Sequence, residues 1–330
     1  MMIYVSVPNS NELDTFLTDR ARKKLEELGD VIYNTSVQYL LPEEIKEEAN
    51  CDVIISSWGA PQFNQSYLQI FRKLKLYVYL GGSVANIVND DFFKAGIRII
   101  SGNDIFARSV AEGCLCYMLC SLRNIEKYST MVRNGGWRER DFFNQGLFNK
   151  LVGLIGFGAV SRHLAPLLKS FGAKVKAYDK YVSSATMQTM GVEPASMEEL
   201  FSTCDIVSIH LPKTPETEKT IGKELLKSMK DGALLVNTSR GEILDENALI
   251  EELATGRISA ALDVFDGGVM DICNPLRYLK NVLPLPHMAG PTIDMREQTA
   301  LELISDIERF TRGELMYNEI IQSRAKLMTR

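Results

Sequence analysis

The chain has 330 residues, of which 45% are hydrophobic and 24% are charged. These are ordinary values for a globular protein and argue against disordered and fibrous classes. At about 100–200 residues per domain, the length predicts two domains. A net charge of -5 argues against a nucleic-acid-binding protein and against a polybasic membrane-surface protein.

No run of 18 consecutive apolar residues occurs, so we expect no membrane-spanning helix. The N-terminal segment MMIYVSVPNS lacks the features of a signal peptide, which favours a cytosolic protein. Six cysteines make no disulfide framework. Cys114, Cys116 and Cys120 lie close together, but no second pair of ligands completes a zinc set. We expect them to be reduced, buried thiols that pack in the core.

Short β-rich runs alternate with helical patterns from the start of the chain, which is typical of parallel α/β architecture. In the first third, a helix is expected near residues 12–28 and strands at 3–7, 31–37, 52–57, 74–80 and 97–101. The pattern predicts a small doubly wound unit.

The rest of the chain continues the alternation after a long apolar helix expected at 110–127. Strands are expected at 151–156, 174–179, 205–210, 233–238, 258–264 and 281–286. Their near-continuous apolar character predicts a sheet that is covered on both faces. A last helix should run from Ile293 to Arg312 and end at Gly313. We expect the tail to pack back onto the first unit, giving one domain of residues 1–103 with 291–330 and another of 104–290.

A dinucleotide fingerprint follows the expected strand at 151–156. Gly156 would permit a tight turn, and Gly158 would let the backbone approach a pyrophosphate at the N-terminus of a helix. The third glycine of the pattern is replaced by Ser161, which is small enough for close helix–strand packing. Asp179 ends the next strand, where it can accept from both ribose hydroxyls and repel a 2′-phosphate. Asp179 therefore favours NAD over NADP, whereas the positive charge of the adjacent Lys180 favours NADP.

Two residues at strand ends could carry chemistry. His287 follows the expected strand 281–286, and a general acid/base belongs at that carboxyl edge. Arg240 follows the strand 233–238, where its planar fork could bind a carboxylate and a carbonyl. The structural alternatives are a histidine without catalytic function and a surface arginine in a salt bridge. His210 also ends a strand and could contact a cofactor, whereas His163 reads as a structural or surface residue.

These motifs together resemble the D-isomer-specific 2-hydroxyacid dehydrogenases, the family that includes D-lactate, glyoxylate/hydroxypyruvate and 3-phosphoglycerate dehydrogenases. The resemblance covers nearly the whole chain. It is carried by GNDIFARSVAEGCLCYMLCSLRNI, GLIGFGAVS, HLPKTPETEKTIGKELLKSMKDGALLVNTSRGEILDENAL and LPHMAGPT. It implies a flavodoxin-like substrate domain, a Rossmann NAD-binding domain and an active-site cleft between them.

The resemblance also implies residue roles. Arg240 would bind the substrate carboxylate and polarise its carbonyl, and His287 would exchange a proton with the substrate oxygen while hydride passes between C2 and NAD. The backbone at Gly82 and Ser83 would help to bind the carboxylate, and Trp58 is either a core residue or a residue of the crevice. Asp263 would accept from the nicotinamide carboxamide. The cofactor-binding set would be Gly156, Phe157, Gly158, Ala159, Val160, Asp179, His210, Leu211, Pro212, Thr217, Thr238, Ser239, Arg240, Asp263, His287 and Gly290.

Two departures from the family pattern stand out. Ser83 occupies the position where a second glycine is expected. Gly268 occupies the position of the glutamate that is hydrogen-bonded to the catalytic histidine in the family. Asp266 and Asp271 lie nearby but out of register, so either could replace it. The loss keeps open an alternative in which the protein binds NAD(H) and reports redox state to a partner. The run 110–122 is apolar nearly all round, which calls for burial on more than one side. The resemblance places this helix and the loop that follows, residues 110–140, at a homodimer contact.

Overall fold

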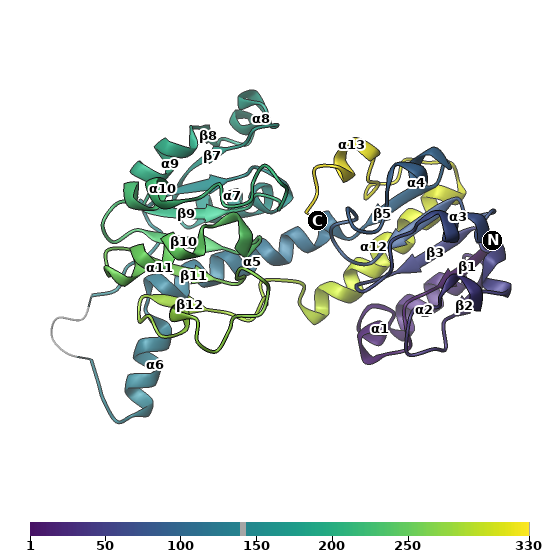
Figure 1. Cartoon of the computed structure of the whole chain (residues 1–330), viewed down its shortest axis with the longest axis horizontal. Coiled ribbons are helices and arrows are strands. Elements are labelled where there is room, and N and C mark those ends of the chain that lie inside the picture. The colour runs from purple at the N-terminus through teal and green to yellow at the C-terminus, as the bar shows by residue number, and fades with distance from the viewer. Residues whose placement is uncertain (139–142, 330) are drawn as a thin grey trace. The chain divides into compact units, whose positions relative to one another are not determined.

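The computed structural model describes residues 1–138 and 143–329 (Figure 1). They form two compact units: unit 1 comprises Met1–Phe106 and Pro291–Arg330, and unit 2 comprises Ala107–Gly290. Each unit is built on one parallel sheet. The predicted α/β class with two doubly wound sheets is therefore confirmed.

Unit 1 contains a five-stranded sheet in the order β2-β1-β3-β4-β5, and every neighbouring pair is parallel. Its strands are β1 (Met2–Val5), β2 (Asp30–Tyr33), β3 (Val53–Ser56), β4 (Leu76–Tyr79) and β5 (Arg98–Ser101). This is the flavodoxin-like order, in which ligands bind outside the carboxyl ends of the strands. Each strand lies inside or within one residue of a predicted range.

The helices of unit 1 cover both faces of this sheet. They are α1 (Asn11–Phe16), α2 (Asp19–Glu26), α3 (Gln65–Ile70), α4 (Asp90–Lys94), α12 (Ile293–Thr311) and α13 (Gln322–Ala325). The single helix expected at 12–28 is wrong, because the Thr18 side chain accepts from Ala21 N and starts a second helix. Helix α12, yellow-green in Figure 1, packs beside α1, α2 and β5, as expected for a tail that returns to the first unit.

Unit 2 contains a seven-stranded parallel sheet in the order β12-β11-β10-β9-β6-β7-β8. Its strands are β6 (Leu151–Ile155), β7 (Lys174–Tyr178), β8 (Glu193–Pro194), β9 (Ile206–Ile209), β10 (Leu234–Asn237), β11 (Ser259–Leu262) and β12 (Val282–Pro284). The strand order reverses beside β6, which is the topological switch point of a Rossmann fold. Strand β8 was not predicted from the sequence because it has only two residues.

Helices flank this second sheet and connect its strands. They are α5 (Asn103–Leu122), α6 (Ile125–Arg133), α7 (Ala159–Ser170), α8 (Ser184–Thr189), α9 (Met197–Thr203), α10 (Lys223–Ser228) and α11 (Glu246–Ala254). Short 3-10 turns η1 (Pro42–Glu44) and η2 (Glu47–Asn50) lie in unit 1, and η3 (Gly241–Ile243) and η4 (Pro275–Arg277) lie in unit 2.

Helix α5 bears on two sequence-based expectations, the absence of a membrane-spanning helix and the burial of three cysteines. It is long and apolar enough to cross a membrane by length and composition, with a mean hydropathy of 1.4 over 18 residues, although the search for consecutive apolar residues found no such segment. Its Ala111, Cys114, Tyr117 and Met118 pack in the hydrophobic core of unit 2. We therefore interpret α5 as a core helix.

The cysteines of α5 differ in burial because a helix turns about 100° per residue. Cys114 is buried as expected, but Cys116 is exposed and Cys120 is only partly buried. The expectation of three buried thiols is therefore wrong for these two. Their sulfur atoms lie 3.9 Å apart, one helical turn from each other. All six cysteines are free.

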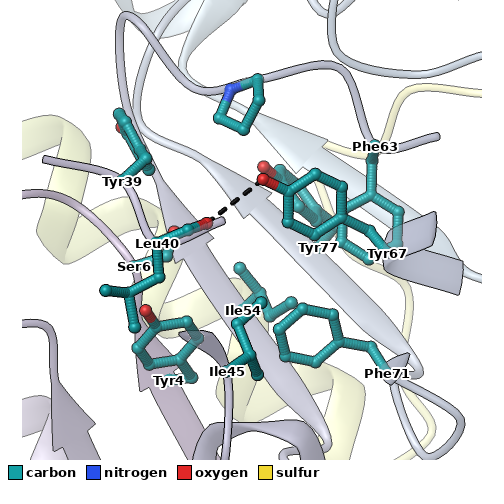
Figure 2. A pocket seen from close by; sticks show the side chains of 11 residues that line it. Tyr4, Ser6, Tyr39, Leu40, Ile45, Ile54, Phe63, Tyr67, Phe71 and Tyr77 are labelled. Carbon is teal, nitrogen blue, oxygen red and sulfur yellow. Dashed lines mark hydrogen bonds between the residues drawn. The ribbon is translucent and has the colours of Figure 1, made fainter. Parts of the chain in front are cut away.

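A cavity of about 30 Å³ lies within unit 1 (Figure 2). Aromatic side chains line most of it, and the Tyr67 hydroxyl donates to the Leu40 carbonyl oxygen. The Tyr4 hydroxyl is buried and has no hydrogen-bond partner. A cavity of this size is too small for a dinucleotide, so we interpret it as a feature of the core.

Candidate active site

The turn between β6 and α7 has the geometry that a dinucleotide fingerprint requires. Gly156 has φ +95°, and a Cβ there would lie 2.8 Å from the His210 carbonyl oxygen. Gly158 is the N-cap of α7, and a Cβ there would meet nothing within 4 Å. The buried Ser161 hydroxyl donates to the Gly156 carbonyl oxygen at 2.5 Å. The backbone of Gly158 is therefore open to a ligand, while Ser161 pins the turn to the helix that begins with Ala159 and Val160.

Asp179 is held rigidly at the end of β7. Its carboxylate accepts from the backbone N–H groups of Phe157 (2.7 Å), Tyr181 (2.7 Å) and Val182 (2.9 Å). The acid predicted to read the ribose is thereby tied to the fingerprint turn itself. Lys180 is paired with Glu216 at 2.6 Å, and this ion pair weakens the case for Lys180 as a phosphate ligand.

The segment after β9 is a compact loop next to the fingerprint turn. The Thr217 hydroxyl donates to the Pro212 carbonyl oxygen at 2.6 Å and accepts from Thr214 N at 2.9 Å. His210 and Leu211 lie against Gly156, since their backbone atoms limit the space there. The His210 Nε2 atom lies 2.9 Å from the hydroxyl of the buried Ser208. Burial lowers the pKa of His210 to about 4, so the ring is neutral at pH 7.

This neutral histidine should make stability depend on pH. The ordinary pKa is about 6.5, so between pH 6.5 and 4 the unfolded chain binds a proton that the folded protein does not bind. The free energy of unfolding should therefore fall as the pH drops through that window, by up to about 3 kcal/mol. Urea unfolding of the wild type, His210→Gln and His163→Gln would measure it. His210→Gln should lose this part of the pH dependence and His163→Gln should keep it; identical profiles for all three would contradict the assignment.

Arg240 lies on a tight turn that Asn237, at the end of β10, organises. The buried Asn237 side chain donates to the Arg240 carbonyl oxygen at 2.9 Å and accepts from Ser239 N at 3.0 Å. The Arg240 Nη1 atom donates to the Ser239 carbonyl oxygen at 2.6 Å. Burial lowers the pKa of Arg240, with the nearby Glu242 acting in the opposite direction. Most of the guanidinium N–H groups have no acceptor among the described residues, so they can bind an anion.

Gly241 brings this turn against the segment after β11. A Cβ on Gly241 would lie 2.0 Å from the carbonyl carbon of Phe265 and 2.4 Å from Asp266 N. These are backbone atoms of the chain and cannot move aside as a flexible side chain could. The glycine is therefore required for the position of Arg240.

His287 lies on the segment after β12, which Asp263 holds in place. Asp263 is 1% exposed. Its carboxylate accepts from Met288 N at 2.8 Å and from Ala289 N at 2.9 Å. His287 itself is exposed and has φ +54°, an unusual conformation for a residue with a side chain. Asp263 thus fixes the backbone that presents His287, a positioning function that the sequence did not indicate.

Helix α5 packs against the segment that follows His287 and contacts Thr238 and Asp263. A Cβ on Gly113 would lie 2.5 Å from the Ala289 carbonyl oxygen, and one on Gly290 would lie 2.8 Å from Val110. The Cys114 sulfur lies 2.9 Å from the Thr238 hydroxyl, and the Tyr117 hydroxyl donates to Asp263 at 3.3 Å. Burial raises the pKa of Cys114 to about 12, so this thiol stays protonated.

The loop after Phe265 supplies no carboxylate to His287 among the described residues. Asp271 accepts from Cys273 N at 2.7 Å, and Asp266 donates its backbone N–H to Glu246. Neither aspartate side chain has a hydrogen bond to His287. Gly268 has φ +90°, so a glutamate at this position would be strained. In this conformation of the loop, glycine therefore fits position 268 better than the glutamate that the resemblance implies.

The predicted substrate residues of unit 1 lie after β4. Gly82 is partly buried. The Ser83 hydroxyl donates to the Thr329 carbonyl oxygen at 2.5 Å and accepts from Ala85 N at 3.4 Å. The C-terminal tail therefore engages the side chain of Ser83, and only its backbone is available to a ligand. Trp58 follows β3 and is partly buried.

Comparison with known proteins decides the family. Residues 115–289 match the D-isomer specific 2-hydroxyacid dehydrogenase, NAD binding domain. The chain belongs to the D-isomer specific 2-hydroxyacid dehydrogenase family. Unit 2 contains its NAD-binding domain, and NAD is the cofactor.

Individual relatives agree with this assignment. D-3-phosphoglycerate dehydrogenase of Methanocaldococcus jannaschii is 33% identical over 92% of this chain, which spans 58% of that protein. Hydroxypyruvate reductase of Thermotoga maritima is 29% identical over 92% of this chain and 96% of the relative. The NAD-complexed D-isomer specific 2-hydroxyacid dehydrogenase of Lactobacillus delbrueckii ssp. bulgaricus is 25% identical, with a TM-score of 0.79 over 97% of this chain and 100% of that one.

Proposed function

We propose that the protein is an NAD-dependent D-2-hydroxyacid dehydrogenase that interconverts a small 2-oxo acid and its 2-hydroxy acid. The observation that carries the proposal is the position of Arg240. A turn braced by Asn237 and Gly241 presents its guanidinium at the carboxyl edge of the Rossmann sheet. His287 follows β12 at the same edge, where the ligands of such folds bind.

The residues present fit NAD. Gly156 and Gly158 leave the backbone at the start of α7 open for a pyrophosphate, because no side chain caps this helix. The fixed Asp179 carboxylate retains lone pairs for ribose hydroxyls. Asp263 would accept from the carboxamide in addition to its backbone donors. When bound, NADH supplies the hydride that reduces C2.

The chain's own residues would supply substrate binding and proton transfer. Arg240 would bind the carboxylate and the carbonyl oxygen of a 2-oxo acid with parallel N–H donors, and so polarise the carbonyl. The imidazolium of His287 would donate its proton to that oxygen during reduction, and the neutral ring would take it back during oxidation. The backbone N–H groups at Gly82 and Ser83 would add donors to the carboxylate.

The decisive experiment follows NADH oxidation with glyoxylate, pyruvate, hydroxypyruvate and phenylpyruvate. Turnover that depends on any of these acids is the expected result, with the D-isomer as product wherever the 2-hydroxy acid is chiral. NADH binding without turnover of any 2-oxo acid would contradict the proposal. That result would instead fit a protein that reports redox state to a partner.

Cofactor selectivity should depend on Asp179. NADH should be preferred over NADPH by at least about tenfold, a difference of about 1.4 kcal/mol. Asp179→Ala should narrow this gap by weakening NADH binding. Lys180→Ala is the matched control, and it should keep the preference because Lys180 is paired with Glu216. Equal use of both cofactors by the wild type would refute the assignment.

We also propose a cytosolic homodimer that forms through residues 110–140, of which 139 and 140 lie outside the described part. Helix α6 has no buried residue in the described structure. Ile125 and Val132 on it are 52% and 49% exposed, and Trp137 beyond it is 73% exposed. Packing against a second copy would bury this apolar surface. Sedimentation of a 37 kDa monomer at micromolar concentration would contradict the dimer.

A further inference from the structure

Two cysteines of α5 form a pair of thiols that the candidate active site does not use. Cys116 is exposed and Cys120 is partly buried, and their sulfur atoms lie 3.9 Å apart. Cys114 and Met118 of the same helix are buried in the core of unit 2. Because two steps along a helix turn the side chain by about 200°, Cys116 and Cys120 lie on the side opposite that core. Two thiols therefore lie next to each other at the solvent side of α5.

This placement is unusual for cysteine, which is among the most often buried residue types. The residues one and two helical turns before Cys116 are Glu112 and Arg108, and both are exposed and charged. The two cysteines thus continue a solvent-facing stripe of α5. Packing in the core explains Cys114, but it does not explain Cys116.

A disulfide between the two cysteines does not fit the helix. Cβ atoms one helical turn apart are separated by about 5–6 Å, whereas a disulfide requires about 3.5–4.5 Å between them. Closing the bond would therefore distort α5. The pair is suited to binding something between its sulfur atoms rather than to joining them.

The distance between the sulfur atoms matches two ligands of one tetrahedral metal ion. Bonds of about 2.3 Å at tetrahedral angles place two sulfur ligands of Zn²⁺ about 3.8 Å apart. The sulfur atoms of Cys116 and Cys120 are 3.9 Å apart. The helix therefore holds both ligands in position before an ion binds.

Electrostatics favour a cation at the same place. Burial and the neighbouring Cys116 raise the pKa of Cys120, because two adjacent thiolates would repel each other. A divalent cation bound to both sulfur atoms offsets that repulsion and deprotonates the thiols on binding.

We propose that Cys116 and Cys120 form a two-thiolate site for a tetrahedral, thiophilic ion of the Zn²⁺ class. No third histidine, cysteine, aspartate or glutamate joins them in a ligand set among residues 1–138 and 143–329. The two remaining positions take water or the same pair of a second copy, since both cysteines lie in the segment 110–140 of the proposed homodimer contact. The inference does not depend on turnover of 2-oxo acids.

Titration of the reduced, metal-free full chain with Cd²⁺ tests the site, because bonds between Cd²⁺ and thiolates absorb in the ultraviolet. We expect a saturable absorbance band that Zn²⁺ abolishes by displacing Cd²⁺. Cys116→Ser and Cys120→Ser should each weaken Cd²⁺ binding by at least about tenfold, since each removes one of the two thiolates. The matched control is Cys273→Ser, which removes the other exposed cysteine and should bind Cd²⁺ as the wild type does.

The number of ions bound identifies the remaining ligands. Saturation at one ion per chain supports the site with water as the other ligand, and saturation at one ion per two chains in a sedimenting dimer supports a site shared with a second copy.

A wild type without the thiolate band would overturn the inference, as would a single variant, Cys116→Ser or Cys120→Ser, that binds Cd²⁺ with wild-type affinity. Circular dichroism checks that each variant is folded. Because Cys116 is exposed, its substitution leaves the core intact and decides the result even if Cys120→Ser fails to fold. NADH oxidation by the wild type bears only on the proposed function, so the two proposals can fail separately.

Discussion

Arg240→Gln should lower kcat/KM for reduction of 2-oxo acids by about 100- to 1,000-fold, the usual cost of removing one donor to a developing oxyanion. The guanidinium would bind the substrate carboxylate and polarise the carbonyl at the same time, and the neutral amide does neither well. NADH oxidation at several substrate concentrations gives kcat and KM separately. The loss should appear both as a lower kcat and as a higher KM.

Arg240→Lys separates charge from geometry. Lysine restores a positive charge but lacks the planar fork that matches a carboxylate, so we expect it to recover only part of the loss. NADH binding, followed by fluorescence, should change far less than turnover in both variants. If Arg240→Gln retains more than about a tenth of wild-type kcat/KM, the role of this arginine in substrate binding is wrong.

Gly241→Ala should destabilise the fold by at least about 3 kcal/mol, because the new Cβ has to displace backbone rather than a flexible side chain. The clash is with the carbonyl carbon of Phe265, at 2.0 Å. In a unit of this size the loss corresponds to a fall in Tm of about 6–12 °C. Thermal unfolding followed by circular dichroism measures it.

Gly158→Ala is the matched control for that experiment. A Cβ on Gly158 meets nothing within 4 Å, and its φ of -79° suits any residue. We expect a nearly wild-type Tm together with weaker NADH binding, since the methyl group would enter the space where the pyrophosphate approaches. Two variants with the same Tm and the same NADH affinity would contradict both assignments.

Much of the fold could be predicted from the sequence because it depends on local periodicity. Alternating apolar strands and helices predict parallel α/β units, and the chain shows two of them. Gly156, Gly158 and Asp179 were recognisable because tight turns and ribose recognition restrict the residue types at fixed spacings. The helix predicted at 12–28 failed because a weak local signal, the cap at Thr18, outweighed periodicity.

The residues that support the candidate site could not be predicted from the sequence, because their contacts join segments that lie far apart in the chain. Asn237, Tyr117 and Gly113 belong to ordinary strand and helix patterns, and only folding brings Tyr117 to Asp263, 146 residues away. The sequence by itself therefore indicated the fold class and the family, and it predicted the residues that we expect to contact NAD and substrate. The tertiary structure decided which side chains hold those residues in place, because burial and pairing are properties of the packed chain.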